Sequence, residues 1–352
     1  MTDYSEIDLS RIKDRFKAFA EYECKDYAEL YYKLSYDIAN DDEVSNIASF
    51  AKSGQPVPNI FFAAVHYLLL KNKKNKLAQF YPTITKIQNK DRIPFDLFKE
   101  FCMQNEMKIK KIISERIVQT NVLNRCSYLY PVFSNIISKE GKPTTIIDIG
   151  TSAGLTLNFD KYEYWYNESK IFGESRVKNY SKIIDSEVPE LKPISQKITK
   201  IGIDQNLINP KNEDEKLWLN SLIWADHIDR FTYMEEALKL KELDQINFIQ
   251  GKSVLDFEIV INKIEKSETL IVFATHTLYQ FSPEEKIEFY NMLDKIGKQR
   301  DFYYLSVESM KSFTEKYNTN NAVIELITYK NCNKKEELIG ETNGHGNWIT
   351  WK

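Results

Sequence analysis

The chain has 352 residues, of which 42% are hydrophobic and 28% are charged, and its formal net charge at pH 7 is −3. This length allows two domains with sizeable cores, and the composition is typical of globular proteins. The slight negative charge excludes the overall basic field of nucleic-acid-binding proteins, so we expect no nucleic-acid partner.

The cysteine pattern and the apolar runs indicate a cytoplasmic protein without a membrane segment. No two cysteines form a Cys-x-x-Cys pair, so we expect neither a zinc site nor a redox motif. The first residues are polar and acidic, unlike a signal peptide. The longest apolar run, residues 60–70, is too short to span a bilayer.

The N-terminal part of the chain reads as helical. Residues 1–140 contain one glycine, Gly54, and the other ten glycines follow. Apolar residues recur there at helical spacing, and residues 58–70, 95–117 and 118–138 are predicted helices. We therefore predict an all-helical N-terminal domain over residues 1–140.

From residue 141 the pattern alternates between short strands and helices, which indicates an α/β domain over residues 141–352 with a parallel sheet covered on both faces. The predicted strands are 145–149, 199–203, 246–250, 269–275 and 301–307. The predicted helices are 154–161, 213–240, 252–265 and 283–298. Residues 162–198 form an insertion, and 323–330, 336–341 and 347–351 read as successive terminal strands, which would place an antiparallel strand in the sheet.

The first predicted strand of this domain runs into a glycine-bearing turn. Asp148 is followed by Gly150, Ser152 and Gly154, and the residues after Gly154 are able to start a helix. Glycine allows a tight turn and a close approach of a ligand or of a neighbouring strand. This order of residues resembles motif I of S-adenosylmethionine-dependent methyltransferases, which implies a Rossmann-like sheet. The resemblance implies that these four residues bind S-adenosylmethionine.

The same turn also matches Gly-x-Ser-x-Gly, the nucleophile elbow of α/β-hydrolases, with Ser152 as nucleophile. A hydrolase of this type needs several strands before its elbow, whereas the preceding 140 residues read as helical. The methyltransferase interpretation is therefore favoured. A glycine turn that binds no ligand is the third interpretation.

Asp204 ends the second predicted strand of the sheet, where an acid can accept hydrogen bonds from both ribose hydroxyls of a nucleotide. The alternative is a capping role. Asp204 follows Asp148 at a far greater spacing than the roughly 20 residues that are usual. Methyltransferases often have an acid after the third strand that accepts the adenine amino group, and Lys252 occupies this position. Ser253 or backbone groups are predicted to contact the adenine end of the cofactor instead, and a plain turn is the alternative.

His276 follows the fourth predicted strand, beside the point where the strand order of such a sheet reverses and ligands bind. A neutral imidazole there can accept a proton from a substrate, so His276 is the predicted catalytic residue. Its alternative role is to cap the following helix. Tyr279, in the same turn, is a predicted pocket residue.

Five further polar residues are predicted to line a substrate pocket. Buried amides and imidazoles require partners, which implies either a hydrogen-bond network or a polar pocket. Helix caps and structural hydrogen bonds are the alternative for each of them. These residues are Asn59, His66, Gln119, Asn121 and His345.

The chain resembles the domain of unknown function 2332, an uncharacterised bacterial family. The resemblance rests on residues 55–70, 118–121, 148–155, 202–206, 217–227 and 345–348, which span nearly the whole chain. It implies a helical domain followed by a methyltransferase-like Rossmann domain, and it supplies no substrate. In this family the first acid of the glycine motif is usually Glu, where this chain has Asp148.

The sequence thus predicts a methyltransferase that uses S-adenosylmethionine and modifies an unidentified acceptor, most simply a small molecule. A non-catalytic protein that binds a nucleotide-like metabolite is the alternative, and Lys252 favours it. The third possibility is a serine hydrolase. No metal site is predicted, and the oligomeric state is left open.

Overall fold

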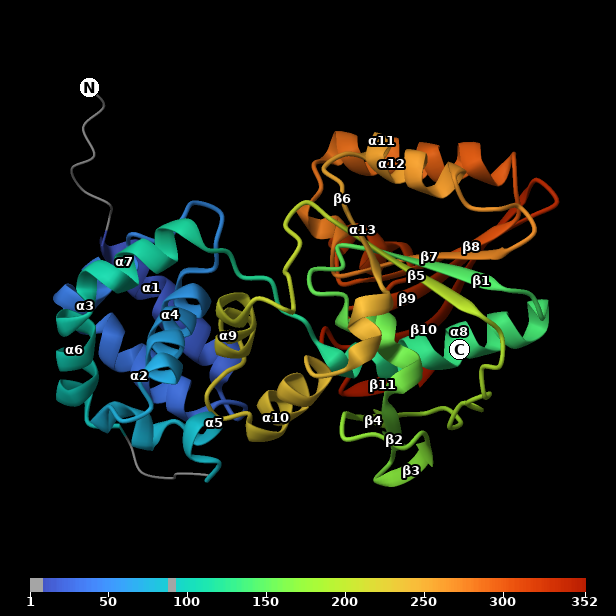
Figure 1. Cartoon of the computed structure of the whole chain (residues 1–352). Helices are drawn as coiled ribbons and strands as arrows, with labels where there is room; N and C mark the ends of the chain where they lie inside the picture. The colour runs from blue at the N-terminus through green and yellow to red at the C-terminus, as the bar shows by residue number, and fades with distance from the viewer. Residues whose placement is uncertain (1–8, 88–92) are drawn as a thin grey trace. The chain divides into compact units, whose positions relative to one another are not determined.

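The computed structural model describes residues 9–87 and 93–352, and its chain forms two compact units (Figure 1). The first unit comprises residues up to Thr120 together with 210–235, and the second comprises 121–209 and 236–352. The sequence placed the division at residue 140. The structure divides the chain elsewhere for two reasons. The helix at residues 126–140 belongs to the unit that contains the sheet, and the segment 210–235 belongs to the helical unit.

The described residues of the first unit form helices and no strands, as the sequence predicted for the N-terminal region. The predicted helix 95–117 is broken at Asn105 into two, and the predicted helix 213–240 is broken around Trp224. The helices are α1 (Leu9–Phe19), the π-helix η1 (Ala20–Cys24), α2 (Glu29–Ala39), α3 (Asp42–Ala48), α4 (Val57–Lys71), η2 (Lys76–Phe80), α5 (Pro82–Thr85), α6 (Phe95–Gln104), α7 (Glu106–Glu115), α9 (Glu213–Ser221) and α10 (Ile228–Ala237).

Helix α4 forms the centre of the first unit. Pro58 lies in its first turn, where the missing N–H group is harmless, and the helix is apolar on almost every side. The rings of Phe61 and Phe62 meet Phe16 at centroid distances of 5.9 Å each, in edge-on arrangements. The segment 210–235 joins this core, since the indole N–H of Trp218 donates to the carbonyl of Ile117.

The second unit is built on a mixed sheet of eleven strands in the order β3-β2-β4-β11-β10-β9-β8-β7-β1-β5-β6. Strands β6, β5, β1, β7 and β8 are parallel, and β9 is antiparallel to β8. The strands are β1 (Thr144–Ile149), β2 (Glu163–Tyr166), β3 (Ser169–Phe172), β4 (Lys178–Ile183), β5 (Ile198–Asp204), β6 (Asn247–Gln250), β7 (Thr269–Thr275), β8 (Phe302–Glu308), β9 (Ala322–Lys330), β10 (Asn333–Thr342) and β11 (Trp348–Trp351).

Helices cover both faces of the parallel strands, with α11 and α12 on one face and α8 on the other (Figure 1). The core beneath α12 includes Phe289, whereas Phe133 of α8 packs on Phe273 of β7 at 5.1 Å. The helical elements of this unit are η3 (Leu123–Arg125), α8 (Cys126–Glu140), η4 (Leu155–Lys161), η5 (Lys241–Gln245), α11 (Val254–Asn262), η6 (Leu278–Gln280), α12 (Pro283–Gly297) and α13 (Lys311–Lys316).

The α/β class and the five parallel strands predicted from sequence are confirmed, in the order 3-2-1-4-5 of doubly wound folds. The insertion 162–198 supplies β2, β3 and β4, which join the sheet through β11. The predicted helix 154–161 is wrong as an α-helix: it is the short 3₁₀ helix η4, preceded by the left-handed Gly154 and kinked at Asn158. The glycine turn therefore does not open an α-helix.

Candidate functional site

The strand order reverses between β1 and β7, and open α/β sheets bind ligands beside such a reversal, at the carboxyl ends of the strands. Three acids lie at this edge of the sheet. Asp148 is the second-last residue of β1, Asp204 ends β5 and Glu308 ends β8. All three side chains are buried, with exposures of 3%, 9% and 1%. Buried carboxyl groups need partners, and these partners define the site.

The glycine loop after β1 is bound to the end of β5. The N–H groups of Gly150 and Thr151 donate to the carbonyl of Ile203 at 2.8 and 3.3 Å, and that of Ser152 donates to Oδ2 of Asp204 at 2.9 Å. Ser152 has a φ of 53°, in the left-handed region that few side chains adopt. The carboxylate of Asp204 thus stabilises an unfavourable backbone conformation.

The two glycines of the loop are required by packing. Gly150 has a φ of 84°, and a Cβ atom there would lie 2.3 Å from Oγ1 of Thr277. Gly154 has a φ of 73°, and its Cβ atom would lie 2.7 Å from the ring of Phe248 on β6. Both positions need glycine even without a ligand, and the side chain of Thr277 covers Gly150 on its Cβ side.

Asp204 lies where the sequence placed it, and both of its oxygens accept backbone hydrogen bonds. Oδ1 accepts from the N–H of Asn206 at 2.8 Å, while Oδ2 accepts from Ser152. Burial raises the pKa of Asp204 above its usual value, although these hydrogen bonds oppose the rise. A carboxylate has about four lone-pair sites, so Asp204 retains acceptor capacity for a ligand.

Asp148 lies beneath the loop and accepts a hydrogen bond from the hydroxyl of Thr156 at 2.6 Å. Burial raises its pKa to about 7, and the nearby negative charge of Asp204 adds to the rise, while the hydroxyl of Thr156 opposes it. Asp148 therefore changes its charge near neutral pH.

The loop after β7 is held in a similar way by the acid at the end of β8. Oε1 of Glu308 accepts the N–H groups of Thr277 and Leu278, each at 2.8 Å. Its other oxygen, Oε2, has no partner among the described residues. Burial raises the pKa of Glu308 to about 7.

His276, the predicted catalytic residue, begins this loop with a φ of 50°. Its N–H group donates to the carbonyl of Val307 at 2.8 Å, and its Nε2 has no partner among the described residues. Burial, followed by the charges of Arg125 and His345, lowers the pKa of His276 to about 3. The imidazole is therefore neutral, and it is a weak base at neutral pH.

Arg125 precedes α8 and carries a charge into this group of residues. Its Nε donates to the carbonyl of Gly344 at 3.2 Å and its Nη1 to the carbonyl of Thr275 at 3.3 Å. Its positive charge lowers the pKa values of both Asp148 and Glu308, which burial raises.

The structure brings together some of the other predicted residues. Asn121 donates from Nδ2 to Oγ of Ser152 at 3.0 Å, so an amide lies at this hydroxyl. His345 lies in the turn before β11, next to Gly344, which is close to the ring of His276. Tyr279 lies in η6, which follows His276 and Thr277 in the chain, and it is 62% exposed.

Ser253 has a capping function in the structure. It precedes α11 and forms a capping box with Asp256, whose carboxylate accepts from the hydroxyl and the N–H of Ser253 at 3.0 Å each. The N–H of Lys252 donates to the same carboxylate, at 2.8 Å. These bonds account for the polar groups of Ser253 without a cofactor.

Three predicted pocket residues, Asn59, His66 and Gln119, belong to the first unit. His66 is fully buried in α4, with Nε2 at 2.9 Å from the hydroxyl of Thr83 and Nδ1 at 3.2 Å from the carbonyl of Ser221. Burial lowers the pKa of His66 to about 4. Both ring nitrogens have structural partners, which is the alternative that the sequence left open.

Sequence reasoning missed Glu308 and Arg125. Glu308 could have been found from the sequence, because it directly follows the predicted strand 301–307, as the other two acids mark the ends of their strands. The prediction ended this strand one residue before Glu308. Arg125 had no signal, since it lies inside a predicted helix that begins only after it in the structure.

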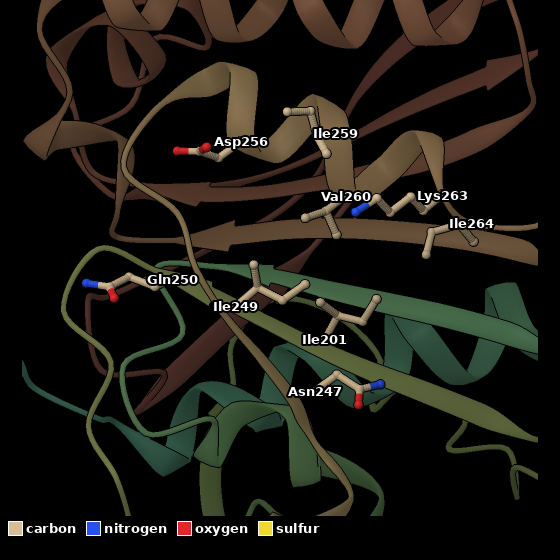
Figure 2. Close-up of a pocket in the computed structure, with 9 residues that line it drawn as sticks. All are labelled: Ile201, Asn247, Ile249, Gln250, Asp256, Ile259, Val260, Lys263 and Ile264. Carbon is tan, nitrogen blue, oxygen red and sulfur yellow. The ribbon is translucent and has the colours of Figure 1, made fainter.

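A separate groove lies between α11 and the strands β5 and β6, of which β6 is at the edge of the sheet, with a volume of about 330 Å³ (Figure 2). Aliphatic side chains form most of its wall, and none of the predicted site residues lines it. Its lining residues are Ile201, Asn247, Ile249, Gln250, Asp256, Ile259, Val260, Lys263 and Ile264.

Within residues 9–87 and 93–352, no cluster of His, Cys, Asp and Glu side chains is suited to hold a metal ion. Over the same residues, no helix combines the length and the apolar character needed to cross a membrane.

Residues 13–351 match the family described as "Uncharacterized protein conserved in bacteria (DUF2332)". The chain belongs to this family. The match confirms the resemblance seen in the sequence and covers both units. None of the curated proteins matches the chain.

Proposed function

We propose that the second unit binds S-adenosylmethionine at the carboxyl ends of β1 and β7 and transfers its methyl group to a small-molecule acceptor. The observation that carries the proposal is the sheet: five parallel strands in the order 3-2-1-4-5, with an antiparallel strand beside the fifth and acids at the ends of the first two. Doubly wound sheets bind nucleotides at this reversal of strand order.

The residues present fit such a cofactor. Asp204 retains lone pairs that would accept the ribose hydroxyls, and Asp148 would lie at the methionine end of the cofactor. Oε2 of Glu308 and Nε2 of His276 are buried polar atoms without partners among the described residues, so they have hydrogen bonds to offer a ligand. When bound, S-adenosylmethionine supplies the electrophilic methyl group.

The chain's own contribution to the reaction is positioning. Methyl transfer gains mostly from holding the acceptor and the methyl group in line, and a strong base is not essential. His276, neutral because burial and Arg125 lower its pKa, would orient the acceptor by a hydrogen bond.

A non-catalytic protein that binds a nucleotide-like metabolite is the second candidate. Two observations favour it. The side chain of Thr277 packs against Gly150, which narrows the approach to the glycine loop. Lys252 is exposed where an acid would accept the adenine amino group, and the nearby acid Asp256 is used for capping.

A serine hydrolase has less support, because the partner of Oγ of Ser152 is the amide of Asn121. A serine nucleophile needs a base within hydrogen-bond reach.

Calorimetry and thermal denaturation with S-adenosylmethionine, S-adenosylhomocysteine, NAD and ATP test the proposal. S-adenosylhomocysteine should bind and raise the melting temperature, as a ligand selective for the native state does. A shift with NAD or ATP and none with S-adenosylhomocysteine at millimolar concentration contradicts the cofactor assignment. Formation of S-adenosylhomocysteine during incubation with a bacterial metabolite extract separates an enzyme from a binding protein.

A further inference from the structure

Arg125 precedes α8, and hydrogen bonds of its neighbour Asn124 fix its position in the fold. Nδ2 of Asn124 donates to the carbonyls of Tyr180 and Gly346 at 2.8 and 2.9 Å, and its Oδ1 accepts from the N–H of Tyr180 at 2.7 Å. These bonds connect the segment to β4 and to the turn before β11. Arg125 therefore extends from a rigid base toward the carboxyl ends of the parallel strands.

The guanidinium of Arg125 has donors that the protein does not use. A guanidinium carries five N–H groups, and two of them donate to the carbonyls of Gly344 and Thr275. The remaining three have no acceptor among the described residues, where Arg125 also forms no ion pair. Arg125 is neither buried nor fully exposed, so a ligand can reach it.

No carboxylate among the described residues forms an ion pair with Arg125. Burial raises the pKa values of Asp148 and Glu308 to about 7, so each is ionised only in part at neutral pH, and neither carboxyl group forms an ion pair with Arg125; His276 is neutral. A partly buried cation without a paired anion is unfavourable unless a ligand supplies the anion. The planar fork of arginine matches a carboxylate, to which it can donate two parallel hydrogen bonds.

We infer that Arg125 binds a ligand carboxylate at the carboxyl ends of β1 and β7, through the N–H groups that its bonds to Gly344 and Thr275 leave unused. This inference rests on the proposed function for the location of the ligand. Two ligands could present the group: the methionine end of the cofactor, or an acceptor that is itself a carboxylic acid.

Calorimetry on the full chain distinguishes these sources. Wild type, Arg125→Gln and Arg125→Lys are titrated with S-adenosylhomocysteine and with 5′-methylthioadenosine, which lacks the amino-acid group. A panel of small carboxylic acids and their primary amides follows, with and without S-adenosylhomocysteine. Arg176→Gln is the matched control, because it removes one positive charge from the same unit at a side chain that is 87% exposed.

If the cofactor supplies the carboxylate, Arg125→Gln weakens S-adenosylhomocysteine by about tenfold or more and leaves 5′-methylthioadenosine unchanged. If the acceptor supplies it, both adenosyl ligands are unaffected, and an acid that binds wild type better than its amide loses about tenfold in Arg125→Gln. Arg125→Lys should lose less than Arg125→Gln in either case, because it keeps the charge without the fork.

The inference is overturned if S-adenosylhomocysteine binds Arg125→Gln within twofold of wild type and, in the acid panel, either acids bind wild type no better than their amides or they also bind Arg125→Gln within twofold. Binding of 5′-methylthioadenosine, with the melting temperature of the free variants, shows that the site is folded. Should wild type bind no adenosyl compound, the proposed function fails, while the acid panel alone still decides on Arg125. If no acid binds either, both fail.

Discussion

Asp148 should make the second unit less stable as the pH rises, and Asp148→Asn should remove this effect. The pKa of its side chain rises from 3.8 to about 7 on folding, mainly because the carboxyl group is buried. A group with a raised pKa contributes its full stability below pH 3.8, and loses this contribution as the pH rises through about 7. This stability begins to fall above pH 3.8, where the side chain of Asp148 ionises in the unfolded chain but stays protonated in the folded chain.

The size of the effect follows from the difference between the two pKa values. A difference of about 3 pH units corresponds to about 4 kcal/mol, at about 1.36 kcal/mol for each unit. Asparagine has nearly the same shape and does not titrate, and its oxygen can still accept from the hydroxyl of Thr156. At pH 4 the variant and wild type should therefore differ by at most about 1 kcal/mol. By pH 8 the variant should have gained up to about 4 kcal/mol over wild type.

Urea denaturation of both proteins at half-unit intervals from pH 4 to pH 8 measures this difference. Coincident transitions by circular dichroism and tryptophan fluorescence should be checked first, because a chain with two units can unfold in two steps. A difference that stays constant within about 1 kcal/mol over this range refutes the reasoning. Asp256→Asn is a control whose pKa shift has the opposite sign, because the N–H of Lys252 and the hydroxyl and N–H of Ser253 lower the pKa of Asp256. The stability difference between Asp256→Asn and wild type should therefore be constant from pH 5 to pH 8 and shrink only in stronger acid.

Three further substitutions test the loops. Asp204→Ala leaves the N–H groups of Ser152 and Asn206 unpaired. Urea denaturation should show that the free energy of unfolding falls by about 2–4 kcal/mol, and by less in Asp204→Asn. A change below about 0.5 kcal/mol in Asp204→Ala contradicts this. Gly150→Ala should lower the melting temperature, and Thr277→Ala in the same chain should restore part of it, unless the contact between the two loops is absent in solution. Ser152→Ala should keep ligand binding, and wild type should not be labelled by a fluorophosphonate, because covalent labelling would identify Ser152 as a nucleophile.

The strands of the parallel sheet could be predicted because each is a short run of β-branched and apolar residues. The acids that end them were visible for the same reason. Asp148 and Asp204 were found at the ends of the first two strands, and Glu308 carries the same signal. What the pattern did not show is that one carboxylate oxygen of Asp204 and one of Glu308 accept backbone N–H groups of a neighbouring loop.

The helical segments were harder to assign to a core. An apolar face predicts that a helix is buried, but it does not say against which partner. The helix that contains Phe133 packs on Phe273 of the sheet, while the segment with Trp218 joins α4 and its neighbours. Arg125 could not be predicted either, because its position depends on contacts of Asn124 with residues that are distant in the sequence.

The two loops at the reversal of strand order are built alike, and this limits where a ligand can act. Each contains a residue with a left-handed backbone, Ser152 or His276, at a cost of about 1–2 kcal/mol. Next to each, the acid that ends the neighbouring strand, Asp204 or Glu308, accepts N–H groups of the loop and offsets this cost. Because these hydrogen bonds within the protein already fix the loops, binding does not have to order them, and affinity depends on the groups that remain unpaired. Among the described residues those groups include the guanidinium of Arg125, which is why its substitution is the most direct test of what the site binds.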